Sequence, residues 1–333
     1  MKKITAIILT AVFAAACVPA LAGCTNGKVK FTLSEEGGKH YIVSFSGLSS
    51  PSGEYEIPAY YDNIPVTEIA AEGFANTNYS KITVPETVTK IGNAAFSYCS
   101  RLKTVEFAQG IKLEKFSHGM FGESTRLARI SIPDSVTSID NYAFVGCTNL
   151  SSVTMNCVER IGINAFSLCS SLEEIALPST LTTIGEMAFY NSGLKSVDIP
   201  DSVTDSVTAD KDGNKKTVYG LGLASFNSCL SLESVKIGKG VKIIPSGAFG
   251  YCRALKEIYL PSSLEEVQGV YKDANGSFVY GHAFYYCTDL TDVYYDGSEE
   301  GWKKIKISTD NLYESGVTMD NSALINAKKH FNS

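Results

Sequence analysis

The chain of 333 residues has few of the groups that catalysis and metal binding commonly use. It holds four His and one Trp, and it contains no CxxC pair, no HExxH or GxSxG motif and no phosphate-binding glycine loop. No nucleophile–base set stands out, and His118 and His282 occupy turn positions where a structural role is expected. We therefore expect no catalytic residues, no metal and no cofactor, so the chain is not expected to be an enzyme.

Long runs of one charge and long internal apolar runs are also missing. The chain has 29 Lys and Arg against 35 Asp and Glu, a formal net charge of −6. Nucleic-acid binding depends on neutralising phosphates, so without a long basic run we expect no nucleic-acid partner. Beyond the N-terminal segment, no apolar stretch is long enough to span a bilayer.

The N-terminal segment is typical of a targeting signal. Lys2 and Lys3 precede a mostly apolar run to Val18, and Leu21 to Cys24 resembles the lipobox of bacterial lipoproteins. This predicts a signal peptide over residues 1–23, lipidation of Cys24 and a short tether over residues 24–28. The protein would then be exported and lipid-anchored to the bacterial membrane at the cell surface. An uncleaved membrane helix and an ordinary signal peptide are the alternatives.

The dominant feature of the remaining chain is a repeated phrase in which a small residue precedes Phe and a Leu follows. Its Phe positions are Phe74, Phe96, Phe121, Phe144, Phe166, Phe189, Phe226, Phe249 and Phe284. Their spacing is 22 to 25 residues, apart from two enlarged copies of 37 and 35 residues. A period near 23 residues is typical of a solenoid, whose coils bury their apolar sides against one another.

One copy shows how the unit is expected to fold. Leu172, Ile175 and Leu177 have the pattern of a half-buried strand, which Pro178 ends because proline cannot donate to a ladder. Ile184 points inward again, and the Ala188-Phe189 pair fills the interior of the coil.

These copies resemble the BspA-like leucine-rich repeats of bacterial surface proteins, most clearly over residues 84–102 and 132–139. The resemblance implies a leucine-rich-repeat solenoid over residues 57–295, a right-handed coil with a parallel sheet on one face and short turns or 3-10 segments. Residues 29–56 read as an N-terminal β-hairpin cap, and residues 296–333 as a C-terminal cap and tail, with a short helix carrying Trp302. The family also implies adhesion or protein–protein contact.

The cysteines follow the repeat. Six occupy the position three residues after Phe, and they are Cys99, Cys147, Cys169, Cys229, Cys252 and Cys287. One Cys per coil at one position favours a ladder of free, buried thiols. Stacked neighbours would lie about 5 Å apart, so disulfides remain an alternative.

Two insertions enlarge the long copies, at residues 205–220 and 268–281. Both contain a turn signal and end in Val-Tyr-Gly, so each is expected to form a β-hairpin, and both are expected at the same place on one edge. Insertions on one edge often build binding sites in solenoids, whereas long surface insertions are also tolerated without a function.

Tyr residues concentrate near the C-terminal end. Tyr259 and Tyr294 fall on the outward strand position, Tyr271 and Tyr280 in the second insertion nearby, and Tyr219 in the first. Tyr suits both protein and sugar partners, so these five residues are the candidate binding site, although packing beneath the C-terminal cap would also explain them.

The predicted function is that of a non-enzymatic adhesion or binding protein of the cell surface, with an extracellular or envelope protein of a host or neighbouring cell as partner. Glycan binding by the Tyr-rich end and an envelope scaffold are the alternatives.

Overall fold

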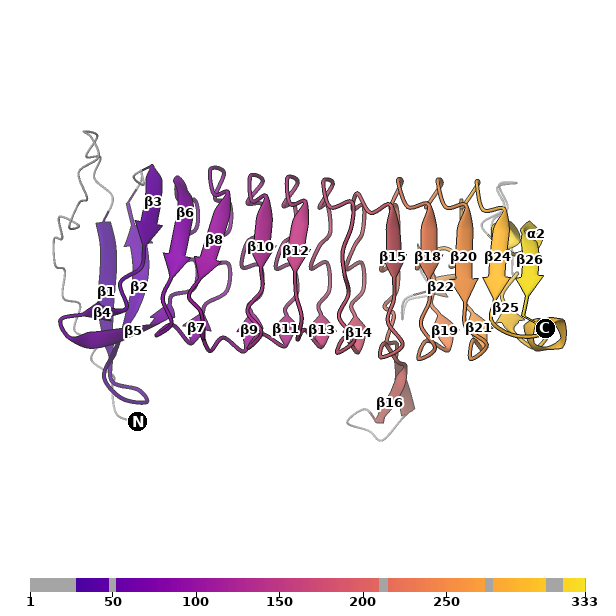
Figure 1. Ribbon diagram of the computed structural model, residues 1–333, viewed down its shortest axis with the longest axis horizontal. Coiled ribbons are helices and arrows are strands. Elements are labelled where there is room, and N and C mark those ends of the chain that lie inside the picture. Colours follow the sequence, from indigo (N-terminus) through magenta and orange to yellow (C-terminus); the bar gives the residue numbers. More distant parts are fainter. Residues whose placement is uncertain (1–27, 48–51, 210–214, 273–277, 310–319, 333) are drawn as a thin grey trace.

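The computed structural model describes residues 28–47, 52–209, 215–272, 278–309 and 320–332. These residues form one elongated coil, with the first described strands at one end of the stack and the last described strands at the other (Figure 1). The expected signal peptide, Cys24 and nearly all of the tether lie outside the described residues. No helix within these ranges is long and apolar enough to cross a membrane.

A row of longer strands forms one side of the coil. Alternate residues of these strands point inward, so Ile82, Val153 and Val293 are buried while their neighbours face solvent. Coils stack in parallel register, for example Ile258 beside Val293. The row consists of β3 (Gly53–Glu56), β6 (Tyr79–Val84), β8 (Thr104–Phe107), β10 (Arg129–Ser131), β12 (Ser152–Thr154), β15 (Ser196–Asp198), β18 (Ser234–Lys236), β20 (Glu257–Leu260), β24 (Asp292–Tyr295) and β26 (Lys328–Phe331).

A second row of parallel strands, most of them two residues long, runs along another side of the coil and adds to the single sheet that we expected. Its inward residues include Ile139 and Ile161, which are register partners and buried. The row consists of β5 (Ile64–Ile69), β7 (Lys90–Ile91), β9 (Lys115–Phe116), β11 (Ser138–Ile139), β13 (Arg160–Ile161), β14 (Thr183–Ile184), β19 (Ile243–Ile244), β21 (Glu266–Val267) and β25 (Lys306–Ile307).

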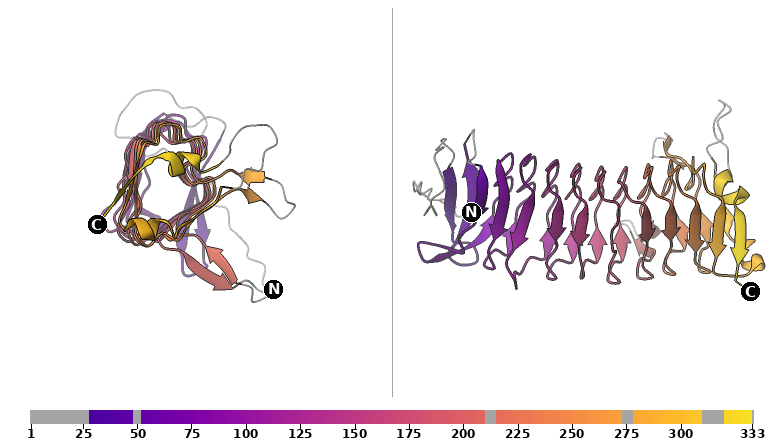
Figure 2. Two further views of the ribbon diagram at one scale, coloured as in Figure 1. Left: turned by 90° about the vertical axis from the view of Figure 1, so that its right-hand side faces the viewer. Right: turned by 45° about the horizontal axis from the view of Figure 1, so that its top comes forward.

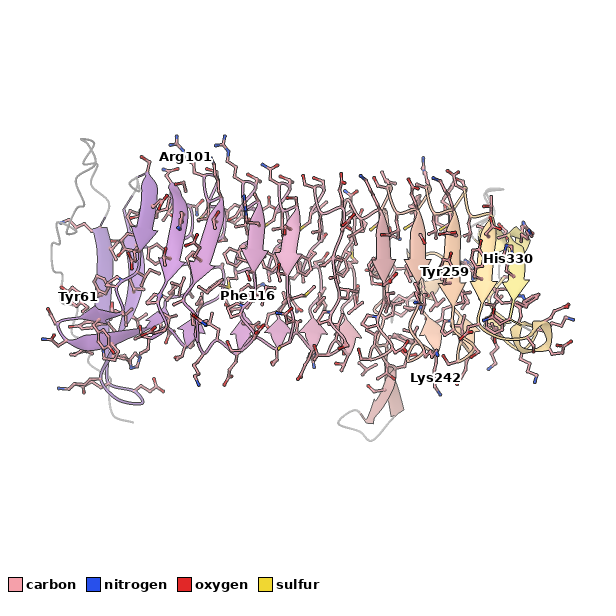
Figure 3. All side chains as sticks on the ribbon, in the orientation of Figure 1. Tyr61, Arg101, Phe116, Lys242, Tyr259 and His330 are labelled. Carbon is pink, nitrogen blue, oxygen red and sulfur yellow. The ribbon has the colours of Figure 1, made fainter. Side chains whose placement is uncertain are left out.

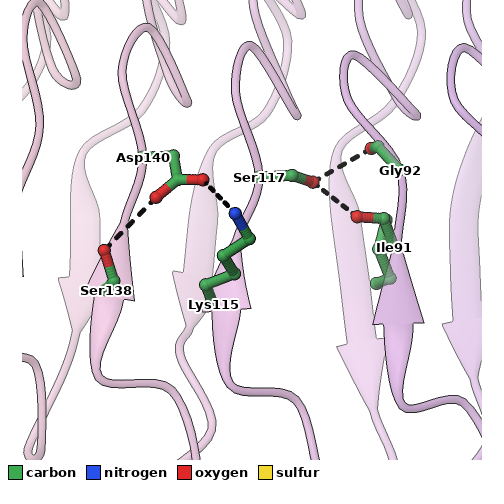
Figure 4. A network of polar contacts seen from close by, with 6 residues as sticks. All are labelled: Ile91, Gly92, Lys115, Ser117, Ser138 and Asp140. Carbon is green, nitrogen blue, oxygen red and sulfur yellow. Dashed lines mark hydrogen bonds and ion pairs between the residues drawn. The ribbon is translucent and has the colours of Figure 1, made fainter.

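Polar side chains on this short-strand row connect neighbouring coils. Lys115 Nζ lies 2.8 Å from Asp140, which also accepts a hydrogen bond from Ser138 (Figure 4). Ser117 Oγ donates to the carbonyl oxygens of Ile91 and Gly92 in the preceding coil. Exposed ion pairs of this kind contribute about 0–1 kcal/mol each. These polar contacts therefore belong to the stacking of neighbouring coils.

The third side is the Phe turn, which extends from two residues before to two residues after each repeated Phe. Alternate amides of the turn donate to the next coil, for example from Phe96 to the Met120 carbonyl at 2.9 Å. Among the described residues, sixteen non-glycine residues have positive φ, and all except Asp62 and Asn63 stand two residues before or after a repeated Phe. This uncommon conformation turns the chain while keeping its amides aligned with the stack.

The repeated Phe rings form a continuous column inside the coil. Consecutive ring centroids lie between 5.0 and 6.0 Å apart, from Phe74 to Phe284, and all nine rings are fully buried. Each coil places its ring against the next, so the column extends the apolar core along the whole solenoid.

The repeat-position thiols are free and buried, as predicted. Each Sγ donates to the Phe carbonyl of the preceding coil, and Cys169 reaches Phe144 O at 3.3 Å. Ser124 occupies the same position in its coil and donates to Phe96 O at 2.6 Å. Burial raises the pKa of the Cys169 thiol, which disfavours a reactive thiolate.

Both ends of the solenoid are covered. At the N-terminal end, β1 (Lys28–Ser34) and β2 (His40–Ser46) form an antiparallel pair that joins the short-strand row through β5. The strand β4 (Tyr60–Tyr61) pairs with β5 as a second hairpin. At the C-terminal end, α1 (Glu299–Trp302) and α2 (Ser322–Asn326) lie beside the last coils, and β26 extends the long-strand row.

Buried Asn321 closes the last Phe turn. Its side-chain oxygen accepts from Phe284 N at 3.1 Å, and its amide group donates to Gln268 O and Ser308 O. A following coil would otherwise accept from Phe284, so this one side chain replaces a missing neighbour.

The two insertions leave the coil at different corners, so the expectation that they share one place is wrong. The strands β16 (Ser206–Ala209) and β17 (Lys215–Val218) precede Leu221, which bridges to Ile184 of the short-strand row. The strands β22 (Tyr271–Lys272) and β23 (Phe278–Tyr280) instead follow β21 of that row. The end-on view of Figure 2 shows the two hairpins diverging from the coil.

The long-strand row is interrupted at residues 173–177, between β12 and β15, where the sequence predicts a regular strand. Ile175 and Leu177 are only partly buried there. The neighbouring coil is one residue shorter between Phe189 and Leu194 than the coils on either side of it, and a Cβ at Gly193 would lie 2.2 Å from Ser170 O. The other two sides keep their hydrogen bonds here, as between Phe166 N and Ala188 O.

We expect the amides of residues 175–177 to exchange rapidly with solvent, because they donate no backbone hydrogen bond. Hydrogen exchange measured by mass spectrometry should show them about 100-fold faster than the amides of β20, which pairs on both sides. Equal protection of the two segments would contradict the interruption.

We expect Cys169→Ser to preserve stability better than Cys169→Ala. A hydroxyl can still donate to Phe144 O, as Ser124 donates to Phe96 O two coils earlier, whereas Ala leaves a gap and an unmade bond. The Ala variant should lose about 1–2 kcal/mol. Urea unfolding followed by circular dichroism measures both variants, and equal losses would show that the S–H donor is unimportant.

Candidate binding surface

Three stacked rings stand on the outer surface of the long-strand row near the C-terminal end. We call Tyr259 of β20, Tyr294 of β24 and His330 of β26 the Tyr–His stack; Figure 3 labels its first and last members. Ring centroids are 4.6 Å apart in the first pair and 4.5 Å in the second, with interplanar angles of 9° and 13°. The stack forms because parallel register places one outward residue of each coil directly beside the next.

Carboxylates border the stack. Glu257 and Asp292 stand two residues before the two Tyr on the same strands, and His330 Nε2 lies 2.7 Å from Asp292 Oδ1. The hydrogen bond with His330, together with one from Thr291, lowers the pKa of Asp292. The pKa of Tyr259 is raised, mainly by partial desolvation and also by the charge of Glu257.

The stacking decides which parts of the rings a partner could reach. Tyr294 has a ring against each face, so its faces are covered and its edge points outward. Tyr259 has a ring against one face only, and on the other side its register partner is Lys236 of β18. Sugars pack against open aromatic faces, whereas ring edges and hydroxyls suit a broad protein contact.

The sequence analysis did not identify His330 as part of this surface. The residue belongs to the stack only because β26 joins the sheet next to β24, and the terminal segment was expected to be an irregular strand or tail. The short alternating run Lys328–Phe331 was the available signal, but its neighbour in the sheet could not be read from the chain.

The Tyr residues of the second hairpin lie elsewhere, so the expectation that they are near Tyr259 and Tyr294 is wrong. Tyr271 and Tyr280 contact each other with centroids 6.3 Å apart. Their hairpin projects from the corner between the short strands and the Phe turns, on the opposite side of the coil from the long strands (Figure 2).

Tyr280 folds back along the Phe turns. Its hydroxyl donates to Glu186 Oε1 at 2.6 Å, across 94 residues of sequence. Tyr280 can cross the intervening coils because these coils carry the small residues Gly247 and Ala224 at this place. A Cβ added to Gly247 would lie 3.2 Å from Tyr280 Cβ and 3.5 Å from Ala224 Cβ. Burial and the bond to Glu186 raise the pKa of Tyr280. Tyr280 therefore anchors its hairpin.

Tyr219 connects the two insertions. Gln268, at the start of the second insertion, donates through Nε2 to the Tyr219 hydroxyl at 2.9 Å. At the base of the first hairpin, Asp205 accepts from the amides of Gly220, Lys242 and Ile243. These contacts hold the hairpin bases against the coil.

Within the described ranges, no group of three His, Cys, Asp or Glu is placed to hold a metal ion. His282 is buried within the last Phe turn.

The repeat geometry agrees with the comparison to known families. The model of the BspA type leucine rich repeat region matches residues 67–157, 110–208 and 215–271, in six copies. The chain belongs to this family. No curated protein matches the chain.

The chain is also similar to solved structures, at low sequence identity. A leucine-rich repeat protein from Bacteroides ovatus ATCC 8483 is 17% identical with a TM-score of 0.50, covering 94% of this chain and 100% of that chain. A leucine rich cell surface protein from Faecalibacterium prausnitzii A2-165 is 19% identical over 88% of this chain and 100% of that chain, with a TM-score of 0.38. The pneumococcal vaccine antigen PcpA is 18% identical over 83% and 93%, with a TM-score of 0.41.

We expect Tyr280→Phe to loosen the second hairpin without unfolding the solenoid, because only the hydroxyl bond to Glu186 is lost. Limited proteolysis should cut within residues 270–281 several-fold faster, while the melting temperature changes by less than about 2 °C. Tyr98→Phe, at an exposed ring of another coil, is the control and should leave the cleavage rate unchanged.

Proposed function

We propose that this protein is a non-enzymatic binding protein of the bacterial cell surface, exported and anchored through lipid on Cys24. It contacts a partner protein, from the envelope or from a host or neighbouring cell, through its long-strand side. The contact centres on the Tyr–His stack. The five Tyr positions do not act as one site in this proposal, because Tyr219 and Tyr280 have structural partners at the hairpin bases.

The stack is the observation that carries the proposal. Its rings are exposed at their edges yet already ordered by one another, so binding costs little additional side-chain entropy. Tyr is enriched at the energetic centres of protein interfaces, and the surrounding carboxylates and lysines supply a polar rim. The family membership supports a role at the surface, and one solved structure of the same fold is named a cell surface protein.

Glycan binding remains the second candidate because the second face of Tyr259 carries no aromatic ring, and 38% of the residue is exposed. A sugar could pack on that face with Lys236 and Glu257 beside it. One open face is a small platform, so the stack gives the protein partner more support than the sugar.

The test is a binding panel with soluble protein from Thr25 to Ser333, immobilised and exposed to extracellular-matrix proteins, bacterial surface extracts and a glycan array. Any protein that binds is then titrated against Tyr259→Ala/Tyr294→Ala. We expect at least about 30-fold weaker binding, which corresponds to a loss of about 2 kcal/mol. The melting temperature should be nearly unchanged, because both rings lie outside the core.

The matched control is Tyr60→Ala/Tyr98→Ala, which removes two rings that are 61% and 59% exposed on other parts of the molecule. Equal weakening by both double variants would remove the Tyr–His stack from the proposal. Binding to glycans alone would favour the second candidate. Binding to no member of the panel would favour an envelope scaffold.

A further inference from the structure

Four cations gather at one corner of the solenoid, far along its axis from the Tyr–His stack. We call Arg101, Lys103, Arg126 and Arg129 the basic ridge. They occupy positions around the repeated Leu in two successive coils, with Arg129 at the start of β10 and the other three between the Phe turn and the long strands, and all four are exposed. Figure 3 shows Arg101 extending outward from this corner. The chain contains five Arg in all, so three of them are on this ridge.

The ridge cations lack the partners that other cations have. Elsewhere, Lys195 pairs with Glu173 and Lys256 pairs with Glu233, each across neighbouring coils. None of the four ridge residues forms an ion pair within the described ranges. The corresponding corner positions of the next coil are Thr148, Asn149, Ser151 and Ser152, which are uncharged.

A shallow hollow of about 530 Å³ lies beside the basic ridge, and three of the ridge cations contribute to its lining. Hydroxyl groups and cations line it together, and the lining consists of Ser80, Ser100, Arg101, Lys103, Thr125 and Arg126. No apolar or aromatic side chain belongs to this set. Neighbouring coils are about 4.8 Å apart, so Arg101 and Arg126 stand at the same position with a spacing that one or two anionic groups can bridge.

We propose that the basic ridge binds an acidic polysaccharide. Guanidinium groups form paired hydrogen bonds with carboxylate and sulfate oxygens, and they remain charged at every physiological pH. Hydroxyl side chains both donate and accept, which matches the hydroxyls that flank the acidic groups of a sugar polymer. The net charge of −6 for the whole chain would repel a polyanion elsewhere, so binding is confined to this corner.

The lining favours a polysaccharide over an acidic peptide. Tight peptide binding usually buries apolar or aromatic anchors in a pocket, and this hollow offers none. A carbohydrate chain needs no such anchor, because charge and hydroxyl contacts along its length provide the affinity. The ridge and the Tyr–His stack share no residue, so the two proposals stand or fall separately.

The experiment is isothermal titration of soluble protein from Thr25 to Ser333 with four polymers in low salt. Dextran sulfate carries sulfate alone, polygalacturonate carries carboxylate, unmodified dextran is the uncharged control and polyglutamate is the acidic peptide. We expect one or both acidic polysaccharides to bind, with affinity that falls steeply as NaCl is raised, and unmodified dextran not to bind. The responses to sulfate and carboxylate identify the preferred acidic group.

The variant Arg101→Gln/Arg126→Gln should weaken polysaccharide binding at least about tenfold, because each lost guanidinium removes a charge-assisted contact. Lys195→Gln/Lys256→Gln makes the same change in net charge at exposed lysines that already have partners, and it should stay within about twofold of the wild type. If both double variants weaken polysaccharide binding equally, the effect comes from net charge alone, and the proposed site is overturned. Binding of neither polysaccharide, or tighter binding of polyglutamate through the same two Arg, would overturn the proposed ligand.

Discussion

Every coil of this protein depends on its two neighbours, because a single turn cannot bury its own apolar side. The constraint is strongest at the Phe column, where each buried ring contacts the rings before and after it. The backbone of the Phe turn follows the same rule, since alternate amides donate to the next coil. The left-handed residues that flank the Phe in these turns are tolerated because this hydrogen bonding repeats from coil to coil. Packing and hydrogen bonding therefore impose a single register on the whole stack.

That register explains where the solenoid is regular and where it departs from regularity. At the last coil no neighbour follows, and Asn321 supplies the acceptor that Phe284 requires. At residues 173–177 the long-strand row is interrupted, yet the Phe column passes this point unbroken. The insertions are accommodated at corners, where extra residues disturb neither the core nor the ladders. The core thus tolerates changes on one side of a coil while the other sides keep the register.

Sequence periodicity was sufficient to predict the features that repeat. The Phe column, the free thiols at one position and the inward residues of the strands all follow from a spacing near 23 residues. Features that depend on a single distant contact were missed. The bond from Tyr280 to Glu186 spans 94 residues, and His330 reaches the stack only through the pairing of β26. The interruption was missed as well, because the copy from Leu172 to Phe189 has a regular pattern and the shortening lies in the neighbouring coil.

In a solenoid, the same repeat position of successive coils forms a row of neighbouring side chains on the surface. Binding sites can arise where several side chains in such a row have similar chemistry. Most outward positions vary along their row, so a local run of one chemistry is a departure that the core does not require. The Tyr–His stack is such a run on the long-strand side, and Arg101 with Arg126 is another at the corner. In both places the repeat fixes the spacing while the side chains are free to change. Substitutions there should alter binding while leaving the Phe column, and hence the fold, intact.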